Sequence, residues 1–353
     1  MTTDCFKASD YKKTTLPMLL IQDFDLSSAT SFHLPARARW MAEYDSVDQL
    51  RSILANPQFA TMKRLHIGAG SNLLFTKSFD GLVLHSAMKG MSTVTDDGES
   101  VIIRAESGIV WDDFVQHCVD NNLYGAENLS YIPGEVGASA VQNIGAYGVE
   151  VKDLIVKVEA LDTFTAGMVT FTADECKYGY RDSLFKRPDL AGRYIITAVH
   201  YRLWHTPRYT LDYGPLKELR EVTYLTPATV RNRVIEIRRS KLPEPSELGS
   251  AGSFFKNPVI DKSMWRHIQA SYPEAPHYDV DDNLVKVPAG WLIETSGLKG
   301  AVEGGAMVYP RQCLVIVNTG NATSDDVVKL YRRVQATVYD RFGIMLSPEV
   351  NVI

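Results

Sequence analysis

The sequence predicts an α+β fold of three packed units, and three observations support this prediction. Short apolar strands lie beside an amphipathic helix in the first third of the chain, several strand patterns fill the middle, and a new helical pattern begins at Thr226. A chain of 353 residues is long enough for two or three domains, and its 45% apolar and 22% charged residues are typical of a folded enzyme.

The first unit is predicted to contain a strand, a glycine-rich turn and a second strand over residues 64–84. A further strand over 101–105 leads into a helix, because Val110, Phe114 and Cys118 recur at helical spacing. A strand that leads directly into a helix indicates layers of helix and sheet.

The middle of the chain is predicted to be rich in β-structure. Strand patterns cover residues 155–161, 168–172 and 194–204. In the last of these, alternate residues form one face, which consists of Ile195, Thr197, Val199, Tyr201 and Leu203.

Two later helices have clear boundary signals. The first is capped by Thr226, has Pro227 at its first position, and is predicted to turn one apolar face inward: Val230, Val234 and Ile237. We therefore place a domain boundary just before Thr226. The second is predicted to run from an N-capping Ser324 to Gly343, with an inward face of Val327, Tyr331, Val334 and Val338.

Charge and cysteine content exclude several classes of function. A formal net charge of −5 argues against binding to nucleic acid or to an anionic membrane surface. The four cysteines are far apart and indicate neither a metal site nor a disulfide framework: Cys5, Cys118, Cys176 and Cys313. The N-terminal residues MTTDCFKASDYKKTT lack the pattern of a signal peptide, so we expect a cytoplasmic protein.

Two glycine-rich segments are candidates for binding a phosphate. GAGSNLLF, residues 68–75, offers consecutive backbone N–H groups, although by itself it is as consistent with an ordinary turn. Residues 130–153 combine four glycines with small residues, which is costly for a helix, and this composition favours backbone that lies against a ligand. Together the two segments predict a pyrophosphate held between them.

Four polar residues have a functional interpretation beside an ordinary one. Arg181, in KYGYRDSLFK, is either a surface ion-pair partner or a fork aimed at a carboxylate or oxyanion. Ser253 lies in the apolar bend GSAGSFFKNPV. Lys241 is either a solvated surface cation or a point charge suited to a diphosphate or a carboxylate, and Glu349 is either a solvated terminal residue or held near a reaction centre.

Six segments in order resemble the UDP-N-acetylenolpyruvoylglucosamine reductase (MurB) family. They are GAGSN, SYIPGEVGASAVQNIGAYGVE, YGYRDSLFK, GSAGSFFKNP, AGWLIETSGLKG and SPEV, and the resemblance covers the chain from about residue 20 to its end. RLWHTPRYTLDYGPLKEL, which carries Tyr213, is similar to the longer type I branch, although its DYG differs from the TYG of some members.

The resemblance implies a two-part FAD-binding region of the vanillyl-alcohol-oxidase (PCMH) type and a separate α/β substrate-binding domain. It implies FAD-binding subdomains at 1–88 and 89–225, with 344–353 returning to the second, and a substrate domain at 226–343. It implies a catalytic set of Arg181, Ser253 and Glu349, and substrate contacts from Tyr213, Lys241, Asn257 and Gln312. It implies cofactor contacts from Gly68, Ala69, Gly70, Ser71, Asn72, Leu73, Ile132, Pro133, Gly134, Val136, Gly137, Ala138, Gln142, Asn143, Gly145, Ala146 and Tyr147.

The implied reaction reduces the enolpyruvyl ether of a UDP-sugar to UDP-N-acetylmuramate, with non-covalent FAD and with NADPH as co-substrate. Ser253 would protonate the substrate carbon, while Arg181 and a protonated Glu349 would stabilise the enolate. Phe254 and Phe255 would exclude water from this acid, or one of them would belong to the core of its domain instead. We expect a monomer in the bacterial cytoplasm, without metal, nucleic acid or membrane.

Two other classes of function stay open from the residues alone. One is an FAD-dependent oxidase or dehydrogenase of the same flavin fold that acts on an alcohol or a sugar lactone. The other is a nucleotide-binding module without catalysis, against which the presence of Arg181, Ser253 and Glu349 argues.

Overall fold

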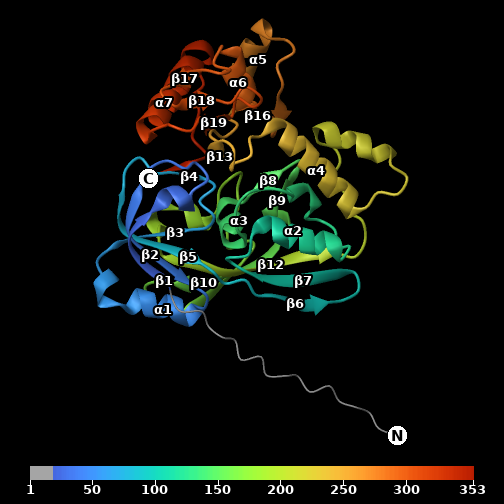
Figure 1. Cartoon of the computed structure of the whole chain (residues 1–353). Coiled ribbons are helices and arrows are strands. Elements are labelled where there is room, and N and C mark those ends of the chain that lie inside the picture. Colours follow the sequence, from blue (N-terminus) through green and yellow to red (C-terminus); the bar gives the residue numbers. More distant parts are fainter. Residues whose placement is uncertain (1–18) are drawn as a thin grey trace.

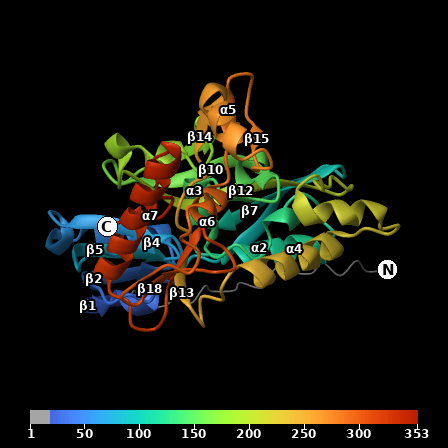
Figure 2. The same ribbon diagram turned by 90° about the horizontal axis from the view of Figure 1, so that it is seen from above.

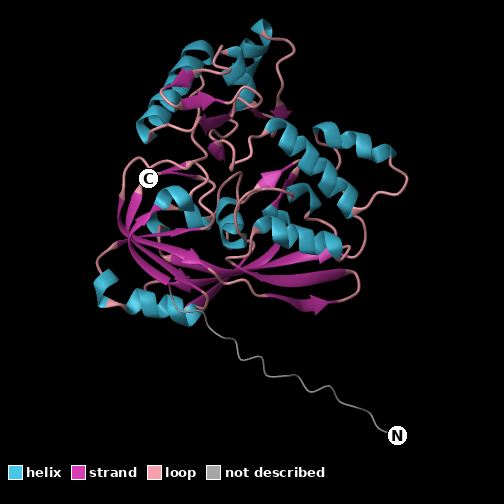
Figure 3. Cartoon of the chain, in the orientation of Figure 1, coloured by secondary structure: helices cyan, strands magenta, loops and turns pink. Residues whose placement is uncertain are grey.

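Three units surround a common centre in the computed structural model, which describes residues 19–353 (Figure 1). Residues 1–18 lie outside the described residues, and with them Cys5, the start of the expected 1–88 subdomain and the N-terminal stretch that was expected to lack a signal peptide. Helices and strands alternate through all three units (Figure 3), and the α+β class predicted from the sequence is confirmed.

The first unit is a four-stranded sheet with strand order β1-β2-β5-β3. Its strands and helix are β1 (Leu19–Asp25), β2 (Arg37–Tyr44), β3 (Lys63–Ile67), β5 (Phe79–Ser86) and α1 (Val47–Ala55). β5 runs parallel to both β2 and β3, so the glycine-rich turn of 68–72 leaves the sheet at the carboxyl end of β3. Leu50 and Ile53 of α1 are fully buried against this sheet and against two strands of the second unit.

The second unit is an antiparallel sheet with strand order β11-β10-β12-β7-β6. Its strands are β6 (Met91–Asp96), β7 (Ser100–Glu106), β10 (Ile155–Asp162), β11 (Met168–Thr172) and β12 (Tyr194–Trp204). Two helices, α2 (Trp111–Asp120) and α3 (Val136–Gln142), pack on one face of the sheet, followed by the short strands β8 (Gly145–Ala146) and β9 (Val149–Glu150). The predicted alternate face of β12 is buried throughout.

The third unit contains two small sheets and three helices, and it lies over the first two units in Figures 1 and 2. One sheet has the order β13-β19-β18-β17, from β13 (Gly249–Ser253), β17 (Val302–Glu303), β18 (Ala306–Val308) and β19 (Val315–Asn318). The other consists of β14 (Val259–Asp261), β15 (Tyr278–Asp279) and β16 (Leu284–Lys286). The helices are α5 (Lys262–Ser271), α6 (Ala289–Thr295) and α7 (Ser324–Phe342).

Short 3-10 helices connect these elements. They are η1 (Leu26–Ala29), η2 (Pro57–Phe59), η3 (Glu127–Leu129), η4 (Val151–Asp153), η5 (Leu184–Lys186), η6 (Pro188–Leu190) and η7 (Gly214–Glu221). Within residues 19–353, no helix is long and apolar enough to cross a bilayer.

The boundary expected before Thr226 differs from the structure. Helix α4 (Pro227–Lys241) begins where predicted, yet it packs on α2 and η3 of the second unit. Arg231 donates two hydrogen bonds to Asp112, at 2.6 and 2.8 Å, and one to Gln116 at 2.8 Å. This buried ion pair joins α4 to the second unit, and the sheets of the third unit begin only at β13.

The end of the chain also differs from the expectation that 344–353 returns to the second subdomain. Strand β20 (Asn351–Val352) pairs in parallel with β4 (Leu73–Leu74), which follows the glycine-rich turn of the first unit. The side chain of Glu349 reaches the second unit, where it contacts Arg181. The backbone of the tail therefore fixes the position of Glu349 from the side of the glycine-rich turn.

The predicted N-cap of α7 is wrong by one residue. The N-cap of α7 is Thr323 and not Ser324, because Thr323 accepts a hydrogen bond from the N–H of Asp326, whose carboxylate accepts the N–H of Thr323 in return. The glycine-rich segment 130–153 does contain a helix, α3. Gly137 is needed there because a Cβ atom would lie 2.8 Å from the Cβ of Ser107, so glycine allows the helix to approach its sheet.

Candidate active site

The glycine-rich turn after β3 forms the first wall of the site. Gly70 has φ +63°, a conformation that favours glycine. The backbone N–H groups of residues 69–72 have no hydrogen-bond acceptor within residues 19–353. Consecutive unpaired N–H groups in such a turn are a suitable site for an anion.

The second glycine-rich segment lies directly opposite this turn. The hydroxyl of Ser71 donates to the carbonyl of Pro133 at 3.1 Å, and Gly134, with φ +136°, faces the same hydroxyl. The structure therefore brings together the two segments that the sequence singled out separately.

Two adjoining cavities open between these segments, with volumes of about 370 and 230 Å³. Both are lined by Ser71, Asn72, Glu135, Ala138 and Gln142. Of the other residues expected to bind the cofactor, the larger cavity is lined by Gly68, Ala69, Gly70, Leu73 and Gly137, and the smaller by Ile132, Pro133, Gly134 and Gly145.

Four residues expected to bind the cofactor do not line either cavity: Val136, Asn143, Ala146 and Tyr147. Val136 and Asn143 have no exposed surface, so neither has a face to offer a ligand. Val136 belongs to the core of the second unit, and Asn143 ends α3 with hydrogen bonds to Glu150 and to the carbonyl of Gly179. For these two residues the expectation is corrected.

Arg181, Ser253 and Glu349 line the smaller cavity together, although each comes from a different part of the chain. Arg181 follows the turn at Gly179, Ser253 ends β13, and Glu349 lies on the tail before β20. The N–H of Glu349 donates to the carbonyl of Phe254 at 2.8 Å, which places the tail beside β13.

The guanidinium of Arg181 is held by three contacts. Its Nε donates to Glu349 at 2.8 Å, its Nη2 donates to the carbonyl of Gly145 at 2.6 Å, and its Nη1 lies 3.4 Å from the carbonyl of Asn143. The side chains of Arg181 and Glu349 are 17% and 15% exposed, so this ion pair is largely shielded from solvent. Such a pair presents a fixed positive charge and a carboxylate to the same small volume.

Arg181, which lines this cavity, and two tyrosines close in sequence to its lining segments have a rare backbone conformation. Tyr131, Tyr147 and Arg181 adopt left-handed conformations, with φ of 60°, 49° and 54°. Residues other than glycine, asparagine and aspartate adopt this region rarely and at a cost, and such strain persists where surrounding contacts hold it in place.

Phe254 and Phe255 do not face the cavity. Each is 1% exposed, the rings lie 5.2 Å apart, and both belong to the main apolar core of the third unit, where Phe254 stacks on Tyr331. The expectation that they shield Ser253 from water is therefore corrected, since they position β13 from behind.

The residues expected to contact the substrate lie outside both cavities. Tyr213 is 42% exposed, packs against Tyr147 and stacks on Tyr278 with ring centroids 6.2 Å apart, and partial desolvation by these neighbours raises its pKa to about 12. The side-chain oxygen of Asn257 accepts the N–H of Ala289 at 2.9 Å. The remaining two are Lys241, exposed at the end of α4, and Gln312, which accepts the N–H of Leu314 at 3.3 Å.

Two charged residues that sequence reasoning missed also line the smaller cavity. Arg238, on α4, donates from Nε to the carbonyl of Tyr131 at 2.9 Å, and burial lowers its pKa. Its only sequence signal was its place beside the apolar face of a predicted helix. Glu135 lies between two predicted cofactor residues, and nothing local distinguished it from a helix cap.

Comparison with known proteins gives two family models and close relatives. Residues 39–170 match an FAD binding domain, and residues 244–353 match the UDP-N-acetylenolpyruvoylglucosamine reductase C-terminal domain. A UDP-N-acetylenolpyruvoylglucosamine reductase of Bacteroides fragilis strain YCH46 is 47% identical over 333 residues, 94% of this chain and 99% of the relative. One from Porphyromonas gingivalis strain ATCC 33277 is 46% identical over 94% of this chain and 98% of the relative.

A solved structure has the same fold. The crystal structure of UDP-N-acetylenolpyruvylglucosamine reductase (MurB) from Thermus caldophilus superimposes with a TM-score of 0.65 and 23% identity, covering 95% of this chain and 98% of that one. At this identity the likeness concerns the fold alone.

Proposed function

Because the chain belongs to the UDP-N-acetylenolpyruvoylglucosamine reductase family, we propose that its two adjoining cavities bind FAD and that Arg181, Ser253 and Glu349 carry out the chemistry. The protein is an FAD-dependent oxidoreductase that reduces UDP-N-acetylglucosamine enolpyruvate to UDP-N-acetylmuramate with NADPH, a step of peptidoglycan precursor synthesis. The observation that carries the proposed catalytic roles is the meeting of these three side chains at one small cavity.

The residues at the cavities fit FAD. The unpaired N–H groups of 69–72 suit a diphosphate, and Gly134 leaves room for a ligand close to the backbone, because a Cβ atom there would meet only the hydroxyl of Ser71, at 3.5 Å. The smaller cavity has apolar walls at Ile132, Pro133 and Ile144, which suit a flat ring system. When bound, FAD supplies the hydride that adds to the terminal alkene carbon of the substrate.

Hydride addition leaves negative charge on the carbon next to the substrate carboxylate. Arg181 is a suitable group to stabilise this enolate, because its guanidinium is fixed by Glu349 and Gly145 and needs no reorganisation during the reaction. Glu349 is ion-paired in this structure, so its proposed role as a hydrogen-bond donor requires that it take up a proton once substrate is bound.

Ser253 is the proposed proton donor to the enolate carbon. Its hydroxyl makes no hydrogen bond within the described residues, and it faces the cavity from the end of β13. A hydroxyl without a competing partner is free to reach a substrate atom. Gly252, with φ +69°, provides the turn that presents it.

Tyr213, Lys241, Asn257 and Gln312 are proposed to hold the UDP-sugar outside the two cavities. Lys241 is a flexible cation that suits a diphosphate, and Tyr213 extends an aromatic surface from Tyr147 towards the third unit. We further propose that residues 19–225 provide most of the flavin site, with Arg238 and Ser253 completing the smaller cavity. The third unit is proposed to cover the substrate, and the enzyme to act as a monomer in the bacterial cytoplasm without nucleic acid.

An anaerobic experiment tests the function directly. NADPH should bleach the yellow protein, and the enolpyruvyl UDP-sugar should then restore the flavin absorbance. Failure of the substrate to restore it would exclude the proposed reaction. Rapid recovery with oxygen alone, together with turnover of an alcohol, would favour an oxidase of the same fold.

A further inference from the structure

A three-residue cluster lies behind the glycine-rich turn. The Nε2 atom of His85 lies 2.9 Å from Oε1 of Glu135, and its Nδ1 atom lies 2.8 Å from Oε2 of Glu43. The side chains of His85 and Glu135 are 21% and 9% exposed. Glu43, His85 and Glu135 come from β2, from β5 and from the residue before α3, so the cluster joins the first unit to the second.

The geometry fixes the charge of His85. A carboxylate only accepts hydrogen bonds, so an imidazole between two carboxylates must donate from both nitrogens and is therefore positively charged. Burial alone would lower the pKa of His85, but the bonds to Glu135 and Glu43 raise it overall. The nearby His66 is different, because burial lowers its pKa to about 4 and its Nε2 is paired with the hydroxyl of Tyr44 at 2.8 Å.

The second oxygen of Glu135 lies against the glycine-rich turn, and Glu135 also borders a further cavity that Glu43 and His85 line. A Cβ atom on Gly68 would lie 3.1 Å from Oε2 of Glu135, so this oxygen lies against the backbone of the glycine-rich turn. Glu135 also lines both cavities. No hydrogen bond within residues 19–353 involves Oε2, and it lies beside N–H groups that suit a phosphate.

The position of a carboxylate beside an anion site requires an explanation, because a carboxylate repels the anion and cannot donate a hydrogen bond to it. The partner that it can bind is a hydroxyl or another donor. We propose that Glu135, held by His85, accepts a hydrogen bond from a sugar hydroxyl of FAD, and that His85 offsets its charge next to the diphosphate. This inference depends on the proposed position of FAD. The hydroxyl belongs to the ribose or to the ribityl chain.

The test is the affinity of the apoprotein for FAD, measured by titration of flavin fluorescence. Glu135→Ala should weaken FAD about 10- to 100-fold, the range for a hydrogen bond to a charged group. Glu135→Gln has nearly the same shape and an uncharged acceptor, so it should weaken FAD less. Titrations with FMN and with ADP distinguish the two sources, since a loss seen only with FMN assigns the ribityl chain and a loss seen only with ADP assigns the ribose.

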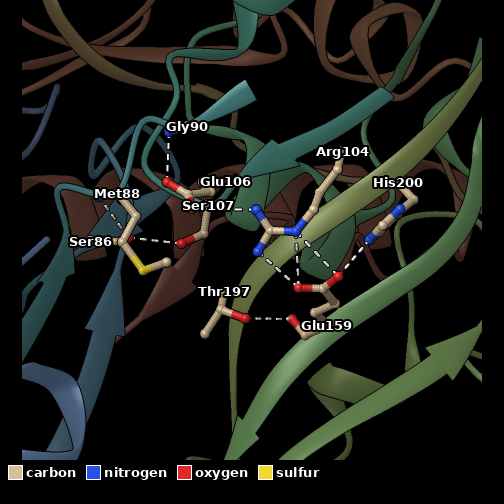
Figure 4. A network of polar contacts seen from close by, with 9 residues as sticks. All are labelled: Ser86, Met88, Gly90, Arg104, Glu106, Ser107, Glu159, Thr197 and His200. Atoms are coloured by element: carbon tan, nitrogen blue, oxygen red, sulfur yellow. Dashed lines mark hydrogen bonds and ion pairs between the residues drawn. The ribbon is translucent and has the colours of Figure 1, made fainter. Parts of the chain in front are cut away.

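A second Glu–His pair provides a matched control. Glu159 accepts from His200 at 2.6 Å and from Arg104 at 2.9 Å, on the sheet of the second unit, and Figure 4 shows both side chains directed at this carboxylate. None of these three residues lines either cavity. Glu159→Gln should therefore lower thermal stability without changing the affinity for FAD.

The outcomes separate the two proposals. The role of Glu135 is overturned if both Glu135 variants are folded and bind FAD, FMN and ADP as tightly as the wild type. It is also overturned if Glu159→Gln weakens FAD binding as much as Glu135→Gln does. If Glu135→Ala does not fold, the affinity of Glu135→Gln for FAD tests the proposal by itself. A wild-type protein that does not bind FAD would instead overturn the proposed function.

Discussion

Replacing Ser253 with alanine separates proton donation from every other function of the cavity. The Ser253 hydroxyl makes no hydrogen bond within the described residues, so its removal should change the free energy of unfolding by no more than about 0.5 kcal/mol. Loss of a general acid typically slows the chemical step about 10²- to 10⁴-fold, which corresponds to about 3–5 kcal/mol of activation free energy. The expected kinetic effect is thus several times larger than any effect on folding.

Stopped-flow measurement of flavin absorbance checks this in two half-reactions. In Ser253→Ala, NADPH should reduce the flavin at the wild-type rate, whereas reoxidation by the enolpyruvyl UDP-sugar should slow by the factor above. Ser250→Ala is a matched control, because Ser250 lies in the same strand, is buried and does not line the cavity. Equal slowing of both half-reactions, or equal slowing in the control, would refute proton donation by Ser253.

Three further predictions concern the ion pairs and one helix cap. Glu349→Gln removes the charge partner of Arg181. Stopped-flow measurement should show that FAD stays bound and that reoxidation of the flavin by substrate is slowed about 10²-fold. An unaffected rate would contradict the role of Glu349. Burial tends to raise the pKa of Asp112, but Arg231 and a backbone N–H lower it overall. The ionised Asp112 therefore stabilises the folded state above its unfolded pKa of about 4, and this stabilisation is lost as the pH falls further. Acid titrations of unfolding should therefore be less steep for Asp112→Asn, and a curve parallel to that of the wild type would argue against this. Thr323→Ala should cost about 1 kcal/mol in urea unfolding, and no loss would show that the α7 cap is dispensable.

Local patterns predicted most of the secondary structure. The strands β10, β11 and β12 and the helices α2, α4 and α7 lie where alternation or helical spacing placed them, within a few residues. These signals depend on neighbours along the chain, which is why they suffice for an element but not for its packing. The attachment of α4 to α2 depends on Arg231 and Asp112, which are 119 residues apart, and no local pattern could predict it.

The site shows the same limit. Its two glycine-rich segments were recognisable because small residues and glycine tolerate close approach of a ligand. Arg181 and Glu349 are 168 residues apart, and only the resemblance to a family placed them together. The glycines of residues 130–153 were expected to make a helix costly, and the packing of the short α3 helix against β7 outweighs the cost of Gly137.

The left-handed backbone at Arg181 has a consequence for protein engineering. Glycine or asparagine at this position would relieve about 1 kcal/mol of conformational cost. Either replacement would also leave the largely shielded carboxylate of Glu349 without its partner, which costs about 3–5 kcal/mol. Position 181 is therefore a poor target for thermostabilisation, because its ion pair stabilises the fold by more than its strained backbone costs.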